Sequence, residues 1–381
     1  MIYFDNSATT KPYDEVLDAY IKVNRDMYGN ASSLHNFGGK SEQLITRARE
    51  QIANLCGVKP TEIYFTSGGT EGNNMAIKGA AMMHRNRGNH IITTAVEHPS
   101  VKEPCEQLRS MGFEITYLPV NKDGVVSITD LRDAITDETT LVSVMYVNNE
   151  VGTIQPIGEI GKLLEQYPKI LFHVDYVQGA GKLPIAIHER FIDLCTFSAH
   201  KFHGLKGTGF LYKKEGVNLA PLITGGNQEY KMRSGTENTG GIVAMAKALR
   251  MAELQRKNNE KKLQLVRAYL CEKLAANSNI IVHTPVTSTP HIINFSAIGL
   301  KGEVLVHALE EQGIIISTTS ACSSKDKLPS GTLKAMKVSD ELAMGAVRIS
   351  MSYDNTLTEA ETFIKALNII LQRLNKVMRR I

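Results

Sequence analysis

A lysine at the end of an apolar run is the first residue in this chain whose position could support catalysis. Lys201 follows the run at residues 194–197, after a small hydroxyl residue and a histidine. A lysine amine attacks an aldehyde only where a dry pocket or nearby positive charge favours its neutral form, and the end of a buried strand is such a place. Taken alone, a lysine like this is more often a solvated loop residue, so its role depends on the rest of the chain.

Three more residues fit the ring of an aldehyde cofactor. Asp175, which ends another apolar run 26 residues before Lys201, is either a helix cap or a charge that keeps a pyridine nitrogen protonated. Gln178 could then reach the ring oxygen. His98 ends a third run and could stack on the ring and move protons near neutral pH, although a capping histidine in a proline turn is the alternative.

The turn at residues 66–72 contains three glycines and opens a predicted helix. Glycines let the backbone approach a ligand closely, and the free N–H groups and the helix dipole favour an anion. The turn lacks the spacing of a dinucleotide site and the lysine of a P-loop. We interpret it as a phosphate cradle, with a simple capped turn as the alternative. Together with Lys201 and Asp175, it predicts a site for pyridoxal 5′-phosphate.

Three residues could handle a substrate. Asn149 offers an amide to the ring or the substrate, with an ordinary asparagine turn as the alternative. Arg348 lies in a strand-like run, where its charge needs a partner that a substrate carboxylate would supply in a bidentate fork. Cys322 lies among small polar residues in a predicted loop, a setting that suits a reactive thiol. Without other support, a loop cysteine is more often incidental.

The elements that must position these residues follow an alternating pattern. Short apolar runs separated mostly by amphipathic stretches predict an α/β fold, with a mostly parallel sheet flanked by helices. Ligands bind such sheets at the carboxyl ends of the strands. We also expect a helix after Pro12, a loop from Gly29 to Gly39 and a helix from about Ser41 to Leu55. The predicted strands are residues 63–66, 90–94, 114–118, 141–145, 170–174 and 194–197.

A different pattern begins near Gly240, where a long predicted helix runs to about Asn277 with a polar middle. We place the domain boundary in that helix. The prediction is a large cofactor-binding domain of residues 13–257 and a smaller α+β domain of residues 1–12 with 258–381, against which the N-terminal segment packs. The elements expected in the smaller domain are strands near Ile292 and Ile314 and helices near Gly302 and Thr358.

Composition supports an ordinary globular protein. The 381 residues are 43% apolar and 22% charged, and this length favours two domains. A net charge of +4 without a dense basic face argues against a nucleic-acid surface. No apolar run would span a membrane and the start does not resemble a signal peptide, so we expect a cytoplasmic protein. Five scattered cysteines without a CxxC pair indicate neither disulfides nor a metal site.

With these residues collected, the chain resembles the cysteine desulfurases of the NifS/IscS type. They belong to the class V aminotransferase branch of the fold-type I pyridoxal phosphate enzymes. The matching motifs lie at residues 5–10, 66–71, 97–98, 147–150, 173–175, 198–201, 232–237 and 320–322.

The resemblance implies that Lys201 binds pyridoxal 5′-phosphate, with Asp175 on the ring nitrogen, Gln178 on the ring oxygen and His98 over the ring. It also implies a homodimer, because one of the phosphate-binding residues would come from a second subunit. The implied phosphate ligands are Gly69, Thr70, Ser198 and His200, joined by Thr236 of the partner subunit.

The resemblance further implies that L-cysteine displaces Lys201 and places its carboxylate on Arg348, with Asn149 nearby. The thiolate of Cys322 would attack the substrate sulfur, releasing alanine and leaving a persulfide. A sulfur-acceptor protein would follow. Because the printed sequence ends at Ile381, short of the extension with which housekeeping desulfurases dock an iron–sulfur scaffold, a tRNA-thiolating enzyme is an alternative acceptor.

Rival interpretations remain at this point. A selenocysteine lyase or an aminotransferase could use the same scaffold, and an aminotransferase would not need Cys322. A non-catalytic scaffold homologue is the alternative from another class. The joint presence of Lys201, Asp175 and Cys322 argues against it.

Overall fold

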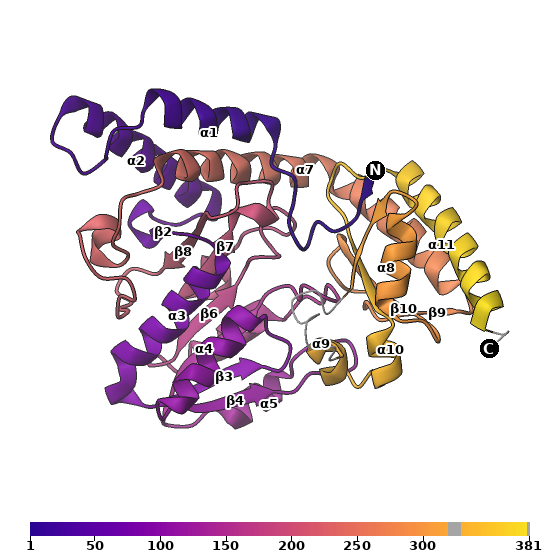
Figure 1. Cartoon of the computed structure of the whole chain (residues 1–381). Coiled ribbons are helices and arrows are strands. Elements are labelled where there is room, and N and C mark those ends of the chain that lie inside the picture. The colour runs from indigo at the N-terminus through magenta and orange to yellow at the C-terminus, as the bar shows by residue number, and fades with distance from the viewer. Residues whose placement is uncertain (319–328, 379–381) are drawn as a thin grey trace.

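A seven-stranded sheet forms the centre of the larger part of the chain (Figure 1). The computed structural model describes residues 1–318 and 329–378. The strand order is β2-β8-β7-β6-β5-β3-β4; β8 pairs antiparallel with β2 and β7, and all other pairs are parallel. The predicted mostly parallel sheet is therefore confirmed. The strands are β2 Ile63–Thr66, β3 His90–Thr94, β4 Glu114–Leu118, β5 Thr139–Met145, β6 Leu171–Asp175, β7 Leu194–Ser198 and β8 Gly209–Lys213.

Helices cover both faces of this sheet, because successive strand residues face opposite sides. Leu194 packs in the core under α3 and α4, whereas the next residue, Cys195, packs in the core under α2, α6 and α7. The helices are α1 Asp14–Asp26, α2 Asn36–Cys56, α3 Gly69–His84, α4 Pro99–Ser110, α5 Ile128–Ala134, α6 Ile157–Leu164 and α7 Thr239–Ala275. Throughout residues 1–318 and 329–378, each helix is too short or too polar to cross a bilayer.

The six predicted runs all form strands, with bounds that differ by at most two residues. The patterns did not predict β8, which starts soon after the turn that carries Lys201. Its residues Gly209 to Lys213 pair antiparallel with both β7 and β2. The link from β7 to β8 is too short for the crossover helix that a parallel strand would need. Because no crossover helix precedes β8, the sequence shows no helical pattern that would mark where this strand begins.

The predicted start of the second helix was wrong. It begins at Asn36 rather than near Ser41, because His35 Nδ1 accepts a hydrogen bond from the backbone N–H of Gly38 and caps the helix. A Cβ at Gly38 would lie 2.5 Å from the carbonyl oxygen of Asn30. The glycine that looked like part of a loop instead allows close packing inside the first helical turn.

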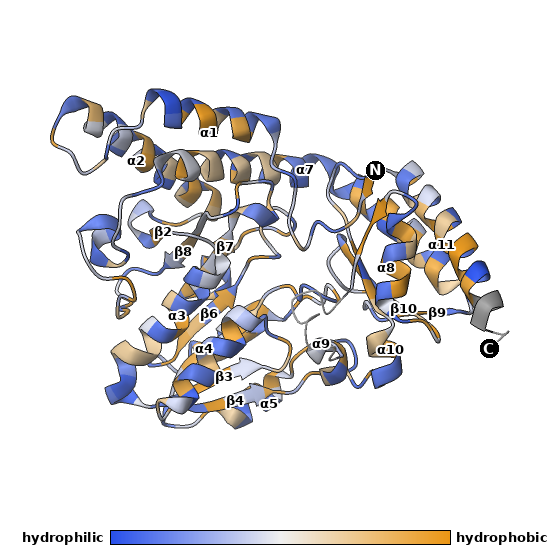
Figure 2. Ribbon diagram, viewed as in Figure 1, coloured by the Kyte–Doolittle hydropathy of each residue, from blue (hydrophilic) through white to orange (hydrophobic). Residues whose placement is uncertain are grey.

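The C-terminal part builds a second, smaller sheet with the antiparallel order β12-β13-β10-β9. As expected, the N-terminal segment returns to it: β1 pairs with β11, and Phe4 lies fully buried in the same core. Figure 2 shows the hydrophobic strand β10 beside α8 and α11, which each have one polar side. The elements are β1 Ile2–Tyr3, β9 Ile280–Val282, β10 Ile292–Ala297, α8 Gly302–Glu310, β11 Ile314–Ile315, β12 Ser317–Thr318, α9 Gly331–Ala335, α10 Asp340–Met344, β13 Ala346–Ser350 and α11 Leu357–Met378.

Helix α7 joins the two parts without a break (Figure 1). Its buried residues belong to the large core as far as Ala252 and to the small core from Leu263 onward. This change supports the predicted boundary near residue 257, which stays a prediction. Several later elements do not follow the division, because Leu333 of α9, Ala343 of α10 and Ala346 of β13 pack in the large core.

The buried N-terminal segment leads to a stability prediction. Phe4 packs edge-on against Phe363 of α11, with ring centroids 5.9 Å apart. We expect Phe4→Ala to lower the free energy of unfolding by about 3–5 kcal/mol, because it leaves a cavity in the small core. Urea denaturation measures this loss. Val286→Ala, at a residue that is 96% exposed, should change it by less than about 0.5 kcal/mol, and an equally small loss for Phe4→Ala would contradict this role of the segment.

Candidate active site

A cavity of about 450 Å³ lies at the carboxyl ends of the parallel strands. Its walls come from the residues after β3, β5, β6 and β7, from the start of α3, from the N-terminal segment and from β13 and α9. The structure therefore brings together side chains that are more than 300 residues apart in sequence, such as Ser7 and Arg348. The predicted site residues that line it are Gly69, Thr70, His98, Asn149, Asp175, Gln178, Ser198, His200, Lys201 and Arg348.

Lys201 ends a single 3-10 turn that directly follows β7. Its Nζ donates hydrogen bonds to the backbone carbonyl oxygens of Ser7 and Ala8, the latter at 2.8 Å. Gln178 Nε2 donates to the same Ser7 carbonyl at 3.0 Å. The N-terminal segment thus forms the wall of the cavity beside the amine.

Asp175 ends β6 and is only 6% exposed. One carboxylate oxygen accepts from Asn73 Nδ2 at 2.8 Å, and the other accepts from the backbone N–H of Val177 at 3.0 Å. These two donors fix the orientation of the carboxylate within the cavity. Asn73 lies on α3 and is a site residue that the sequence patterns did not reveal.

His98 both caps a helix and lines the cavity, so the two interpretations of this residue are compatible. Its Nδ1 accepts from the backbone N–H of Ser100 at 3.1 Å, which caps α4. Because Nδ1 accepts, the neutral ring carries its proton on Nε2. Burial lowers the pKa of His98, Lys201 and Lys102 lower it further, and Asp175 opposes them. The imidazole is therefore mostly neutral at pH 7.

A chain of hydrogen bonds links this imidazole to the carboxylate. Ser100 Oγ lies 2.8 Å from His98 Nδ1 and accepts from Asn73 Nδ2 at 2.9 Å. The same Asn73 amide donates to Asp175. Since every member is buried or half-buried, the orientations of the two predicted ring partners are coupled.

The start of α3 has the features of an anion site. Gly68 precedes it with φ 146°, a conformation that favours glycine, and it has no side chain with which to cap the helix. The N–H groups of the first turn, from Gly69 onward, are then available to an anion. Ser198 and His200 line the same cavity. Burial, with Lys201 and Lys206, lowers the pKa of His200 to about 4, so its ring is neutral at pH 7.

Thr236 lies outside this cavity. It is exposed and lines a separate hollow together with Arg233 and Glu237. Its predicted role, which requires a second subunit, stays a prediction.

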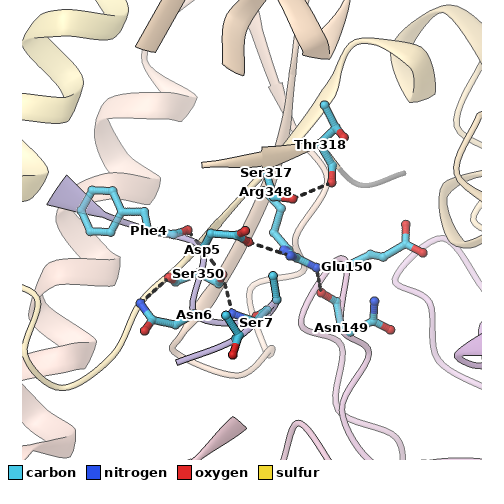
Figure 3. Close-up of polar contacts among 12 residues, drawn as sticks. Phe4, Asp5, Asn6, Ser7, Asn149, Glu150, Ser317, Thr318, Arg348 and Ser350 are labelled. Atoms are coloured by element: carbon cyan, nitrogen blue, oxygen red, sulfur yellow. Dashed lines mark hydrogen bonds and ion pairs between the residues drawn. The ribbon is translucent and has the colours of Figure 1, made fainter. Parts of the chain in front are cut away.

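Arg348 comes from β13 and lies between two partners (Figure 3). One terminal nitrogen pairs with Asp5 at 2.9 Å, and the other donates to the carbonyl oxygen of Asn149 at 2.8 Å. Arg348 is 5% exposed, and its Nε has no hydrogen-bond partner in the part of the chain that the structure describes. The argument that its charge needs a substrate as partner was wrong, because Asp5 already supplies an anion. Its predicted contact with a substrate carboxylate is not tested by this finding.

Cys322 lies outside the described residues. Of the four other cysteines, Cys56, Cys105 and Cys195 are buried, and burial raises the pKa of each of these thiols. Raised pKa values disfavour the thiolate, which is the nucleophilic form. Cys56 and Cys195 both pack in the large core.

Glu97 is a second carboxyl group in the cavity wall that was not proposed as a site residue. One of its oxygens accepts from the backbone N–H of Met145 and from Thr94 Oγ1, whereas Oε2 is buried without a partner among the described residues. Burial raises the pKa of Glu97 to about 8, and the charge of Asp175 adds to this effect. The sequence signal for it was its place immediately before His98, in the matching motif at residues 97–98.

The profile of the family described as aminotransferase class-V matches residues 2–363. The chain belongs to the class V aminotransferase family. It is 48% identical to a NifS/IcsS protein homolog of Lactobacillus delbrueckii subsp. bulgaricus, with 99% of each chain covered. It is 42% identical to the cysteine desulfurase IscS of Dictyoglomus turgidum, covering 99% of this chain and 96% of the relative. A solved structure of a NifS-like protein superimposes with a TM-score of 0.92 at 39% identity, covering 97% of this chain and 99% of the other.

This family uses pyridoxal 5′-phosphate, and the donors in the cavity fit that group. An amine suits its aldehyde, the carboxylate of Asp175 suits its ring nitrogen, and the uncapped start of α3 suits its phosphate. A Cβ at Gly69 would lie 2.9 Å from Val177 Cγ2. A larger residue would therefore push Gly69 and Val177 apart at the wall of the cavity. The predicted cofactor is thereby confirmed at the level of the family.

The raised pKa of Glu97 predicts a pH-dependent contribution to stability. Between its usual pKa and about 8, the folded protein holds a proton that the unfolded chain releases. The stability of the native chain relative to Glu97→Gln should therefore be fully present below the usual pKa and be lost as the pH rises through 8. Urea denaturation at about pH 5 and about pH 8 should show a relative loss on the order of 2 kcal/mol. Equal differences at both pH values would contradict a neutral Glu97.

Proposed function

We propose that this protein is a cysteine desulfurase that converts L-cysteine to L-alanine and transfers the sulfur to Cys322. The observation that carries the proposal is the single cavity in which Lys201 and Asp175 meet the buried guanidinium of Arg348. An amine and a carboxylate suit the cofactor, and a guanidinium suits the carboxylate of an amino acid. Relatives that are 42% identical over nearly the whole chain carry the name cysteine desulfurase.

Each residue has a role in this proposal. Lys201 would hold the cofactor through its amine, and Asp175 would keep the ring nitrogen protonated. Bound pyridoxal phosphate supplies an electron sink for the bonds that break at the substrate. Arg348 and Asn149 hold the substrate carboxylate, and Gln178 bonds the ring oxygen. His98, whose Nδ1 accepts from Ser100 and whose proton therefore lies on Nε2, would move protons beside the ring.

The sulfur step balances without a further reactant. The C–S bond of L-cysteine breaks and an S–S bond forms to Cys322, so L-cysteine and a protein thiol give L-alanine and a protein persulfide. The transferred sulfur is oxidised while the β carbon of the substrate is reduced. A thiol reductant or an acceptor protein then removes the sulfur and restores the thiol.

The proposal extends to the assembly. The phosphate of the cofactor is bound by Gly69, Thr70, Ser198 and His200, with Thr236 of the partner subunit completing the site in a homodimer. The exposure of Thr236 supports this assignment, because a residue outside its own cavity is free to enter another. The sulfur acceptor is an iron–sulfur scaffold or a tRNA-thiolating enzyme, and the protein acts in the cytoplasm.

A turnover assay with Cys322→Ala tests the function. The native protein should be yellow and should form sulfide and alanine in equal amounts from L-cysteine and a reductant. The variant should keep its colour and lose sulfide formation by at least about 100-fold, because no other thiol replaces the nucleophile. Cys271→Ala, which removes a partly exposed cysteine of α7, is the matched control and should retain native turnover.

Full activity of Cys322→Ala would contradict the persulfide step and favour a lyase or an aminotransferase on the same scaffold. A colourless native protein that does not take up pyridoxal phosphate would instead favour a non-catalytic scaffold.

A further inference from the structure

The residues on the two sides of segment 319–328 are attached to different parts of the molecule. On the N-terminal side, Ser317 and Thr318 form β12 of the small sheet and pair with β13, where Ser317 lies opposite Arg348. On the C-terminal side, Ser330 caps α9, and Leu333 of α9 is fully buried in the large core. Cys322 lies between these two attachments in the sequence.

Glu150 makes the polar part of the second attachment. It follows Asn149 in the loop after β5 and lines the cavity. Its Oε2 accepts a hydrogen bond from Ser330 Oγ, and its Oε1 accepts from Thr332 Oγ1 at 3.0 Å. Burial raises the pKa of Glu150, and the hydrogen bonds from Ser330 and Thr332 oppose this shift. The side chain of Glu150 therefore bonds to the residues on both sides of Gly331, which itself lines the cavity.

The loop that carries Glu150 is itself rigidly held. Asn148 Oδ1 accepts from the backbone N–H groups of Glu150 and Val151, at 2.9 and 3.0 Å. The carbonyl oxygen of Glu150 accepts from Asn294 Nδ2 of β10 at 3.1 Å. The neighbouring carbonyl of Asn149 holds Arg348 (Figure 3). One short loop thus contacts the proposed substrate-binding arginine and the start of α9.

We propose that Glu150 is a positioning residue whose carboxylate holds Ser330 and Thr332 against the cavity. Through this hold it supports the sulfur-transfer step of the proposed function. The predicted effect on turnover rests on the proposed function, but the contacts of Glu150 with Ser330 and Thr332 do not depend on it.

Glu150→Gln tests the proposal, because it keeps the size of the side chain but replaces one acceptor oxygen with an N–H₂ donor. The first measurement is the rate at which iodoacetamide alkylates Cys322 in the holoenzyme without substrate, followed by mass spectrometry. Cys271 serves as the internal reference. We expect the rate at Cys322 to change by about fivefold and the rate at Cys271 to stay constant, since the loss of one side-chain hydrogen bond corresponds to about a fivefold factor.

The second measurement separates binding from sulfur transfer. L-cysteine should change the visible spectrum of Glu150→Gln at concentrations within about twofold of those for the native protein, while alanine formation falls by about tenfold. Thr332→Val approaches the same contact from the other side. Because both variants disturb the contacts that Glu150 makes with the start of α9, the loss in the double variant should be smaller than the sum of the two single losses.

Glu359→Gln is the matched control. Glu359 accepts from the backbone N–H of Thr356 at 2.8 Å and from its hydroxyl at 3.4 Å at the start of α11, outside the cavity. It should leave both the alkylation of Cys322 and turnover at native levels.

Native alkylation of Cys322 in Glu150→Gln, or an equal change in Glu359→Gln, would overturn the proposal. So would a loss of affinity for L-cysteine in proportion to turnover, which would make Glu150 a substrate-binding residue. If the native protein forms no alanine while Glu150→Gln still changes the alkylation of Cys322 alone, the proposed function fails and the hold stands.

Discussion

The ion pair between Arg348 and Asp5 is the interaction on which the arrangement of the site depends. A guanidinium that is 5% exposed requires an anion, since an unpaired buried charge is strongly destabilising. Asp5 provides that anion from the N-terminal segment. Two residues later, the carbonyl of Ser7 accepts from Lys201 and from Gln178, so the same segment reaches the amine of the large part. The N-terminal segment therefore connects the proposed substrate-binding residue to the proposed cofactor-binding residue.

The carboxyl groups of the cavity differ in their surroundings, and this difference separates their roles. Asp175 accepts two hydrogen bonds, one on each oxygen, whereas Glu97 has one buried oxygen without a partner among the described residues. Burial holds the pKa of Glu97 near 8. The charge of Asp175 adds to this effect, so the Glu97 carboxyl group in the cavity wall is mostly neutral at pH 7.

Much of the fold was predictable because the strands of a parallel sheet are buried on both faces and appear as continuous apolar runs. The run ending at Asp175 and the run ending before Lys201 both form strands within one residue of their predicted bounds. Strand β8 was not predictable in this way, because a short antiparallel return leaves no helical pattern before it. The glycines at the start of α2 were misassigned because a histidine cap is a weak sequence signal.

The site could be predicted from the residue types at strand ends, and ten of the predicted residues line one cavity. The supporting residues could not be found in the same way. Asn73 lies on a helix facing the sheet, and Asp5 lies 343 residues before its partner. Their roles depend on which surfaces the fold brings into contact. Glu150 stood in a matching motif, but only the position of α9 shows that its side chain bonds to Ser330 and Thr332.

The central claim is that sulfur passes from L-cysteine to Cys322 in the cavity that contains Lys201. The most direct measurement is one turnover of the holoenzyme with ³⁴S-labelled L-cysteine and no reductant, followed by mass spectrometry of the peptide that contains Cys322. The account predicts close to one alanine per chain and a labelled persulfide on Cys322. Alanine without label on Cys322, or label found only on another cysteine, would contradict it.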